Sequence, residues 1–238
     1  MTRFSRTLLP ALAVVALAAP AAAQEIRSPM RYIEPASSFG LFAGYVFTDS
    51  ELRLDSLSSV ALGPQSAPIF GARYQLRLGG PLSGMVSLGV IPSKREVFLA
   101  EPNADSTAIT PISTGNTVSA PVVLVETGLL FGITGPRAWN GLAPFAGVTA
   151  GVATEVGGTS EAEEDIPDGE RYSFGPSIAV GVRLGTDFYL TPRAALRLEL
   201  VGRLWRESAP GGFLNSRQAK VTEWNGASSV QLGAVFHP

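Results

Sequence analysis

The sequence predicts an all-β fold, an eight-stranded antiparallel up-and-down transmembrane β-barrel. Apolar and polar residues alternate with a period of two in eight segments, the pattern of strands with one apolar face. The connections between these segments alternate between long and short. Charged residues make up only 16% of the 238 positions, against about 25% in ordinary soluble domains. This combination argues against a surface that faces water.

Composition also excludes several classes of site. The chain has no cysteine, so a disulfide scaffold, a cysteine-ligated zinc site and a thiol nucleophile are ruled out. Its formal net charge of -2 gives no reason to expect a nucleic-acid partner.

The N-terminal residues have the composition of an export signal. Arg3 and Arg6 precede an apolar run from residue 8 to residue 19, and three alanines before Gln24 form a cleavage site. The run is shorter than the roughly 20 residues needed to span a bilayer as a helix. We therefore expect a cleaved signal peptide at 1–23, a periplasmic lead-in at 24–37 and the barrel domain at 38–238.

The eight expected strands have about the length that a tilted strand needs to cross a bilayer. They are 38–48, 69–79, 82–92, 122–134, 142–154, 171–185, 194–206 and 224–236. In the second segment the even positions from Phe70 to Leu78 are apolar, whereas the odd positions are Gly, Arg, Gln and Arg. The other apolar phases begin with Phe39, Leu82, Val123, Leu142, Tyr172, Leu196 and Val230 in turn. Pro144 and Pro176 remove ladder donors, so we expect them near a rim or a bulge.

The connections predict which end of the barrel is which. Long gaps at 49–68, 93–121, 155–170 and 207–223 alternate with short ones at 80–81, 135–141 and 186–193. Outer-membrane barrels have short periplasmic turns and longer loops on the outside. An even number of strands returns both termini to the short-turn side.

Composition decides which phase faces outward. The polar phase is mostly Gly, Ser, Ala and Thr with a few Arg, which is too little charge for a surface in water. A soluble ligand-binding barrel, with its apolar phase inside, is the alternative. Aromatic residues also lie where membrane interfaces need them. These are Trp139, Phe188 and Tyr189 at the short turns, and Trp205, Trp224, Tyr172 and Phe47 near the long loops.

The last strand carries the most specific resemblance. Residues 228–236 alternate through Val230 and Leu232 to the aromatic Phe236, although His237 and Pro238 follow. This segment resembles the C-terminal assembly signal of the small eight-stranded outer-membrane barrels of Gram-negative bacteria, OmpA-like and OmpW-like. The resemblance implies a monomer in the cell outer membrane. Its partners would be outer-membrane lipid, lipopolysaccharide and, during insertion, the outer-membrane assembly machinery.

The inward phase collects the charges of the strands. We expect an interior polar cluster of Arg73, Arg77, Glu126, Arg183, Arg197, Glu199 and Arg203. We interpret it as an ion-pair network that fills the lumen, with a gate or anion-conducting constriction as the alternative. Five arginines against two glutamates need further partners, such as Gln75, carbonyl groups or Glu223, because unpaired buried charges are costly.

The remaining candidates are weaker. The acidic segment 161–170 lacks the D-x-D-x-D-G register of a calcium loop, so we expect a solvated surface loop and no metal site. The only histidine is His237, and no serine with an orienting carboxylate accompanies it. We expect no catalytic residues, no cofactor and no enzymatic activity, a lipid-modifying barrel enzyme being the alternative.

These observations predict a structural or interaction role in the cell envelope, with a mostly side-chain-filled lumen and long surface loops. The alternative implied by the OmpW-like resemblance is a narrow pore or transporter for small or hydrophobic solutes. A soluble periplasmic ligand-binding barrel is less favoured.

Overall fold

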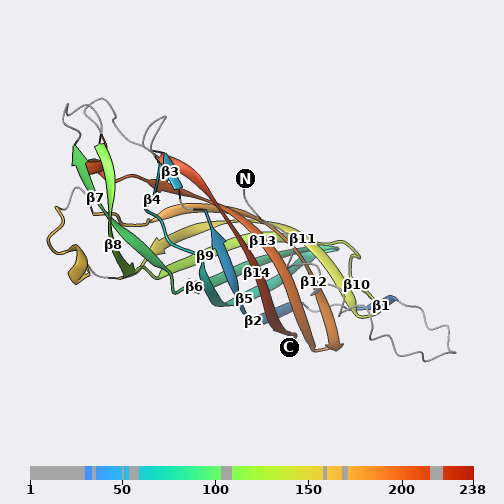
Figure 1. Ribbon diagram of the computed structural model, residues 1–238. Coiled ribbons are helices and arrows are strands. Elements are labelled where there is room, and N and C mark those ends of the chain that lie inside the picture. The colour runs from blue at the N-terminus through green and yellow to red at the C-terminus, as the bar shows by residue number, and fades with distance from the viewer. Residues whose placement is uncertain are drawn as a thin grey trace, which may run out of the picture.

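Eight long strands form a closed antiparallel barrel in the computed structural model (Figure 1). The structure describes residues 30–33, 36–49, 51–53, 59–102, 109–157, 160–167, 171–214 and 222–238, so the expected signal peptide lies outside the described residues. The barrel strands are β2 (Ser37–Thr48), β5 (Ala67–Gly79), β6 (Leu82–Ile91), β9 (Val122–Gly132), β11 (Leu142–Glu155), β12 (Ser177–Thr191), β13 (Ala194–Ser208) and β14 (Thr222–Phe236).

Each barrel strand pairs with its neighbours in sequence, and the last strand closes on the first. At the closure Phe236 of β14 lies opposite Phe39 of β2, and Val230 lies opposite Tyr45. Closure gives every strand two hydrogen-bonded neighbours. This matters in a bilayer, whose core offers no water to an unpaired backbone group. The predicted up-and-down transmembrane barrel is therefore confirmed.

Shorter elements lie at the two ends of the barrel (Figure 1). At the short-turn end, β1 (Met30–Tyr32) pairs with β10 (Arg137–Trp139), so part of the expected lead-in is a strand. At the loop end are the β3–β4 pair (Glu51–Arg53, Ser59–Ala61) and the β7–β8 hairpin (Lys94–Pro102, Ile109–Ser119). The 3-10 turns η2 (Glu161–Glu163) and η3 (Gly211–Phe213) follow in the later loops. Among the described residues, no helix is long and apolar enough to cross a membrane.

The apolar phase of each strand faces outward. Leu232 is 64% exposed and Val182 is 60% exposed, whereas the charged Arg183, next to Val182 in the chain, is 1% exposed. An outer wall of exposed Val, Leu and Phe suits hydrocarbon. The assignment of faces made from composition is therefore confirmed.

Seven predicted strands agree with the observed ones to within two residues at each end, but the sixth is wrong. The expected strand 171–185 is observed as Ser177–Thr191. The reason is Gly175, whose φ of 92° breaks the extended backbone. Tyr172 and Phe174 continue the alternation of the sequence, yet they lie before the strand in a loop and are buried.

The two strand prolines lie near strand ends, as expected. Pro144 is the third residue of β11, close to the short turn. Pro176 lies immediately before β12 and so takes no place in the ladder.

Inward glycines allow the close approach of strands in this narrow barrel. A Cβ on Gly44 would overlap the carbonyl oxygen of Val230 and lie 2.9 Å from the Cα of Gln231. Gly84 lies on the outward phase instead, and its Cβ would meet nothing closer than Leu78 Cδ1 at 3.6 Å. The first glycine is therefore required at the seam between β2 and β14, and the second is not.

We predict that Gly44→Ala lowers the free energy of unfolding by about 1–3 kcal/mol, because it overpacks the seam. Gly84→Ala should stay within about 0.5 kcal/mol of the wild type. Urea unfolding of the protein refolded into lipid vesicles measures both. Equal stabilities for the two variants would contradict the packing argument.

Candidate functional site

The centre of the lumen is an ion-pair network around two glutamates. Glu126 of β9 accepts hydrogen bonds from Arg183 of β12 and from Arg203 of β13, the latter with Nε–Oε1 at 3.0 Å. Glu199 of β13 accepts from Arg73 at 2.6 Å and from Arg183 at 3.1 Å. Arg183 thus joins both carboxylates, and the network spans the barrel. All five side chains are nearly or fully buried.

Neutral side chains extend this central network. Thr149 donates to Glu126 Oε1 at 3.2 Å. Arg203 Nη1 donates to Ser229 Oγ at 3.0 Å, and Gln231 donates to the same oxygen. These contacts bring β11 and β14 into the network.

A second ion pair lies nearer the short turns. Arg197 of β13 binds Asp187 of β12 in a bidentate manner, with Nε–Oδ1 and Nη2–Oδ2 both at 2.6 Å. Its Nη2 also donates to Gln75 Oε1 at 3.0 Å, and Ser38 donates to the same oxygen at 3.1 Å. Such fork-to-fork geometry is the strongest arrangement of arginine with carboxylate.

The structure places six of the seven predicted cluster residues in these two groups. Arg77 is different: it is half-buried at the short-turn rim, where its Nη2 donates to the carbonyl oxygen of Gly80 at 3.0 Å. Asp187 was missed, because the sixth strand was expected to end before it. With Asp187 included and Arg77 outside, four buried arginines face three buried carboxylates within these two groups. The expected excess of positive charge is therefore largely removed.

Aromatic rings pack against the arginines of the lumen and leave a small cavity beside them. The guanidinium of Arg73 lies 5.3 Å from the ring centre of Phe42, and that of Arg197 lies 4.6 Å from the ring centre of Phe145. A cavity of about 10 Å³ borders Arg73, Glu199 and Gln231, which is room for about one water molecule.

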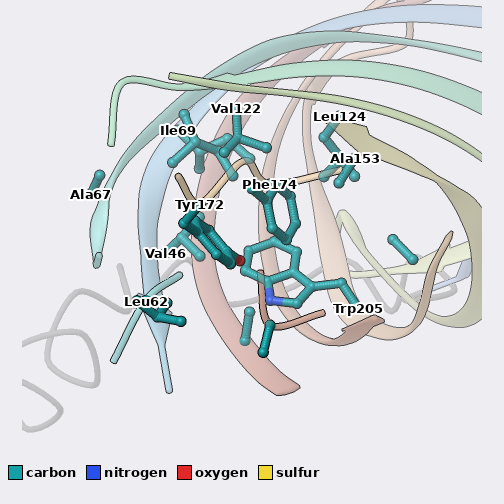
Figure 2. Packing of buried hydrophobic residues seen from close by; sticks show 14 of the residues in the cluster. Val46, Leu62, Ala67, Ile69, Val122, Leu124, Ala153, Tyr172, Phe174 and Trp205 are labelled. Carbon is teal, nitrogen blue, oxygen red and sulfur yellow. The ribbon is translucent and has the colours of Figure 1, made fainter. Parts of the chain in front are cut away.

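An apolar plug fills the loop end of the barrel (Figure 2). Trp205 of β13 points inward, and its ring lies 5.3 Å from that of Phe174 in an edge-to-face contact. Loop residues Leu62, Tyr172 and Phe213 pack with it, together with inward residues of the strands such as Ile69, Val122, Leu124 and Ala153. The long loops therefore fold back into the mouth.

Ion pairs tie these loops together above the plug. Arg95 of β7 contacts Glu155 at 3.4 Å and Glu163 at 2.7 Å, and its guanidinium lies over the ring of Tyr172. Glu155 Oε2 also accepts the backbone N–H of Phe174 at 3.1 Å. Burial raises the pKa of Tyr172 well above its usual value. The acidic segment is thus not simply a solvated loop, because Glu163 is 3% exposed.

The expected aromatic belts are only partly observed. Trp139, Phe188, Trp224 and Phe47 are exposed on the outer wall. Trp205 and Tyr172 are not belt residues, since the first lies on the inward phase and the second in the returning loop. Tyr189 is half-buried and stacks on His237, with ring centres 5.4 Å apart.

The short-turn mouth holds a cavity of about 120 Å³ lined by Arg77, Asp187, Arg197 and His237. The backbone N–H of His237 donates to the Arg193 carbonyl oxygen at 2.9 Å. Among the described residues, its ring nitrogens make no hydrogen bond to a serine hydroxyl or to a carboxylate oxygen. Burial lowers the pKa of His237. In the part of the chain that is described, no three acidic or histidine side chains converge as metal ligands.

The predicted assembly-signal residues lie on the closing strand. Val230, Leu232 and Phe236 are all exposed on the outer wall of β14. Their recognition by the assembly machinery remains a prediction.

We predict that Glu126→Gln destabilises the barrel by about 3–5 kcal/mol, because it leaves Arg183 and Arg203 buried without their shared carboxylate. The matched control is Glu164→Gln in the exposed part of the acidic segment, which should change stability by less than about 0.5 kcal/mol. Urea unfolding in vesicles distinguishes them. A similar small effect of both variants would show that the network does not stabilise the fold.

We predict that acid releases the C-terminal residues from the short-turn rim. The pKa of His237 is lower in the folded protein than the usual 6.5, so docking is complete above about pH 6.5. It weakens as the pH falls through the folded pKa, because the charged ring leaves its buried place. Since this is the only histidine, its NMR titration in micelles is unambiguous. A midpoint at or above 6.5 would contradict the burial argument.

Among the comparisons with known proteins, solved structures give matches. No protein-family model matches the sequence, and no curated protein matches it. The solved structure of Neisserial surface protein A is similar, with a TM-score of 0.51 and 11% identity over 85% of this chain and 97% of that one. Two others are matched at lower scores. The outer membrane protein AlkL has a TM-score of 0.46 and 13% identity over 90% and 95% of the two chains. The N-terminal barrel domain of Pseudomonas aeruginosa OprF has a TM-score of 0.39 and 10% identity over 84% and 99%. The chain therefore has the fold of the small eight-stranded outer-membrane β-barrels.

Proposed function

We propose that the protein is an integral outer-membrane barrel whose lumen is closed to solutes and whose folded loop end serves as an interaction surface of the cell envelope. The observation that carries this proposal is the filling of the lumen. The cavity that borders Arg73 and Glu199 of this network has a volume of about 10 Å³, enough for one water molecule rather than a solute.

Two independent barriers support closure. A solute entering from the short turns meets the Arg197–Asp187 pair and then the Glu126–Arg183–Glu199 network. A solute entering from the loops meets the plug of Trp205, Phe174 and Tyr172. A narrow pore or transporter would need a path through both barriers.

The loop end is organised enough to present a defined surface. The Arg95 ion pairs hold the β7–β8 hairpin against the acidic segment and the end of β11. Arg171 fixes the same segment by donating to the carbonyl oxygens of Ile166 at 2.8 Å and Glu164 at 2.9 Å. An ordered surface loses less conformational entropy when a partner binds. This favours an interaction role.

The remaining parts of the proposal follow from the placement of the barrel. Its surroundings would be outer-membrane lipid and lipopolysaccharide, and it would act as a monomer that the outer-membrane assembly machinery inserts. A catalytic role is not proposed, because His237 stacks on Tyr189 at the rim and, among the described residues, hydrogen-bonds to no serine hydroxyl and no carboxylate.

We predict that the wild-type protein gives no steady conductance in planar bilayers. A variant that combines Trp205→Ala, Arg183→Ala and Glu199→Ala removes one side chain of the plug and one charge of each sign from the network. It should show repeated openings, while Glu164→Gln stays silent. Heat-dependent gel migration verifies that each variant is folded. A steady, large conductance of the wild type would overturn the closed lumen.

A further inference from the structure

The outer wall carries a groove on the side formed by β11 to β14 and the end of β2. Its volume is about 790 Å³, within the roughly 300–1,000 Å³ of ligand clefts. The strand register places Val148 beside Val182, Val182 beside Gly202, Leu204 beside Gly226, and Ser228 beside Phe47. Large side chains form the sides of the groove, and small residues form its floor.

The two floor glycines are not required by packing inside the barrel. A Cβ on Gly226 would meet nothing within 4 Å, and one on Gly202 would meet Val182 Cγ2 at 3.6 Å, an ordinary contact. The inward glycine Gly151 is different, because its Cβ would overlap the carbonyl oxygen of Val125. Closure of the barrel therefore explains the inward glycine and not the outward pair. What the outward pair provides is open space on the wall.

The position of the groove defines the chemistry of its occupant. Its sides are Val148, Val182 and Leu204, each about half exposed or more on the wall that faces hydrocarbon. Trp224, two residues from Gly226 toward the loops, is 53% exposed, and exposed tryptophans mark the membrane interface. The groove therefore lies in the leaflet on the loop side, where an alkyl chain is the group that fills it.

A cation lies at the interfacial end of this groove. Arg206 is exposed on the outer wall, and it pairs in register with Trp224, one outward position beyond the Leu204–Gly226 pair. No acid among the described residues forms an ion pair with it. Asp49 lines the same end of the groove, so a headgroup there meets both an arginine and a carboxylate. Arginine suits phosphate because its planar fork matches phosphate oxygens.

We infer that this groove binds one acyl chain of a phosphate-bearing membrane lipid from the loop-side leaflet, with the phosphate held by Arg206. The inference rests on the barrel spanning the membrane. It does not depend on a closed lumen, so conductance measurements and lipid binding can fail separately.

The test uses quenching of tryptophan fluorescence in the full chain. Trp139→Phe leaves Trp224 as the exposed tryptophan, since Trp205 is buried inside the lumen. The protein is held in maltoside micelles, which contain no phosphate, and is titrated with phosphatidic acid or diacylglycerol carrying brominated acyl chains. We expect saturable quenching of Trp224 by both lipids. Phosphatidic acid should bind about threefold more tightly, the effect of one exposed ion pair.

Two variants separate the chain from the headgroup. Gly202→Leu with Gly226→Leu fills the groove and should abolish saturation for both lipids. Arg206→Gln should retain saturation and remove the preference for phosphatidic acid. The control, Ala43→Leu with Ala72→Leu, places the same two leucines at outward positions of β2 and β5, although each substitution adds one carbon fewer, and should leave both titrations unchanged.

Three results would overturn the binding of an acyl chain in the groove. The first is quenching that never saturates in the parent protein. The second is saturation that survives the filling of the groove. The third is a dimer in the micelle that the groove-filling variant converts to a monomer, because a second copy of the chain would then be the occupant. Equal affinities for the two lipids would overturn the assignment of the phosphate to Arg206. Heat-dependent gel migration shows that the variants are folded, and Arg206→Gln tests the site without altering the groove.

Discussion

The narrow interior of an eight-stranded barrel is the constraint on which the rest of this structure depends. Such an interior has room for side chains and little else, so every inward charge must find its partner there. Glu126 and Glu199 satisfy this by sharing Arg183 between them. In addition, Glu126 pairs with Arg203, and Glu199 pairs with Arg73. A slip of one residue in strand register would turn these charges toward lipid, at about 2–4 kcal/mol for each cation near the midplane. The network thus favours a single register as well as filling space.

Sequence alone predicts the part of this architecture that depends on whether a residue occupies an odd or an even position in its strand. Alternation is a local property, so it identifies the strands, their faces and which charges point inward. An odd or even position gives the face of the strand but not how far along the barrel axis a side chain lies. Arg77 was therefore grouped with the central cluster, although it reaches only the rim. Asp187 was missed for the opposite reason. It has the inward parity, but the sixth strand was placed six residues too early, so the partner of Arg197 fell outside it.

The loop end shows where sequence patterns stop being informative. Tyr172 and Phe174 continue an alternating series that looks like strand, yet Gly175 ends the extended backbone and the two rings turn into the mouth. Trp205 has inward parity and contacts one of them, although its place near a loop suggested a membrane belt. The pairs of Arg95 with Glu155 and Glu163 join segments 60 residues or more apart in the chain. No periodic pattern in the sequence predicts such contacts, because they depend on how separate loops meet in space.

A filled lumen also changes where such a protein can act. If the lumen is closed as proposed, binding is restricted to the loop end, the short-turn mouth and the outer wall. The glycines distinguish the two faces of the barrel wall. Inward glycines such as Gly151 are required because the strands approach closely, whereas Gly202 and Gly226 have open space where a Cβ would be. If the outer wall only had to be apolar, larger residues at those positions would bury more apolar area in the lipid. Gly226 and Gly202 lie on adjoining strands, on the midplane side of Trp224 and Arg206. Their lack of side chains therefore supports the inference that this face is shaped to hold a molecule.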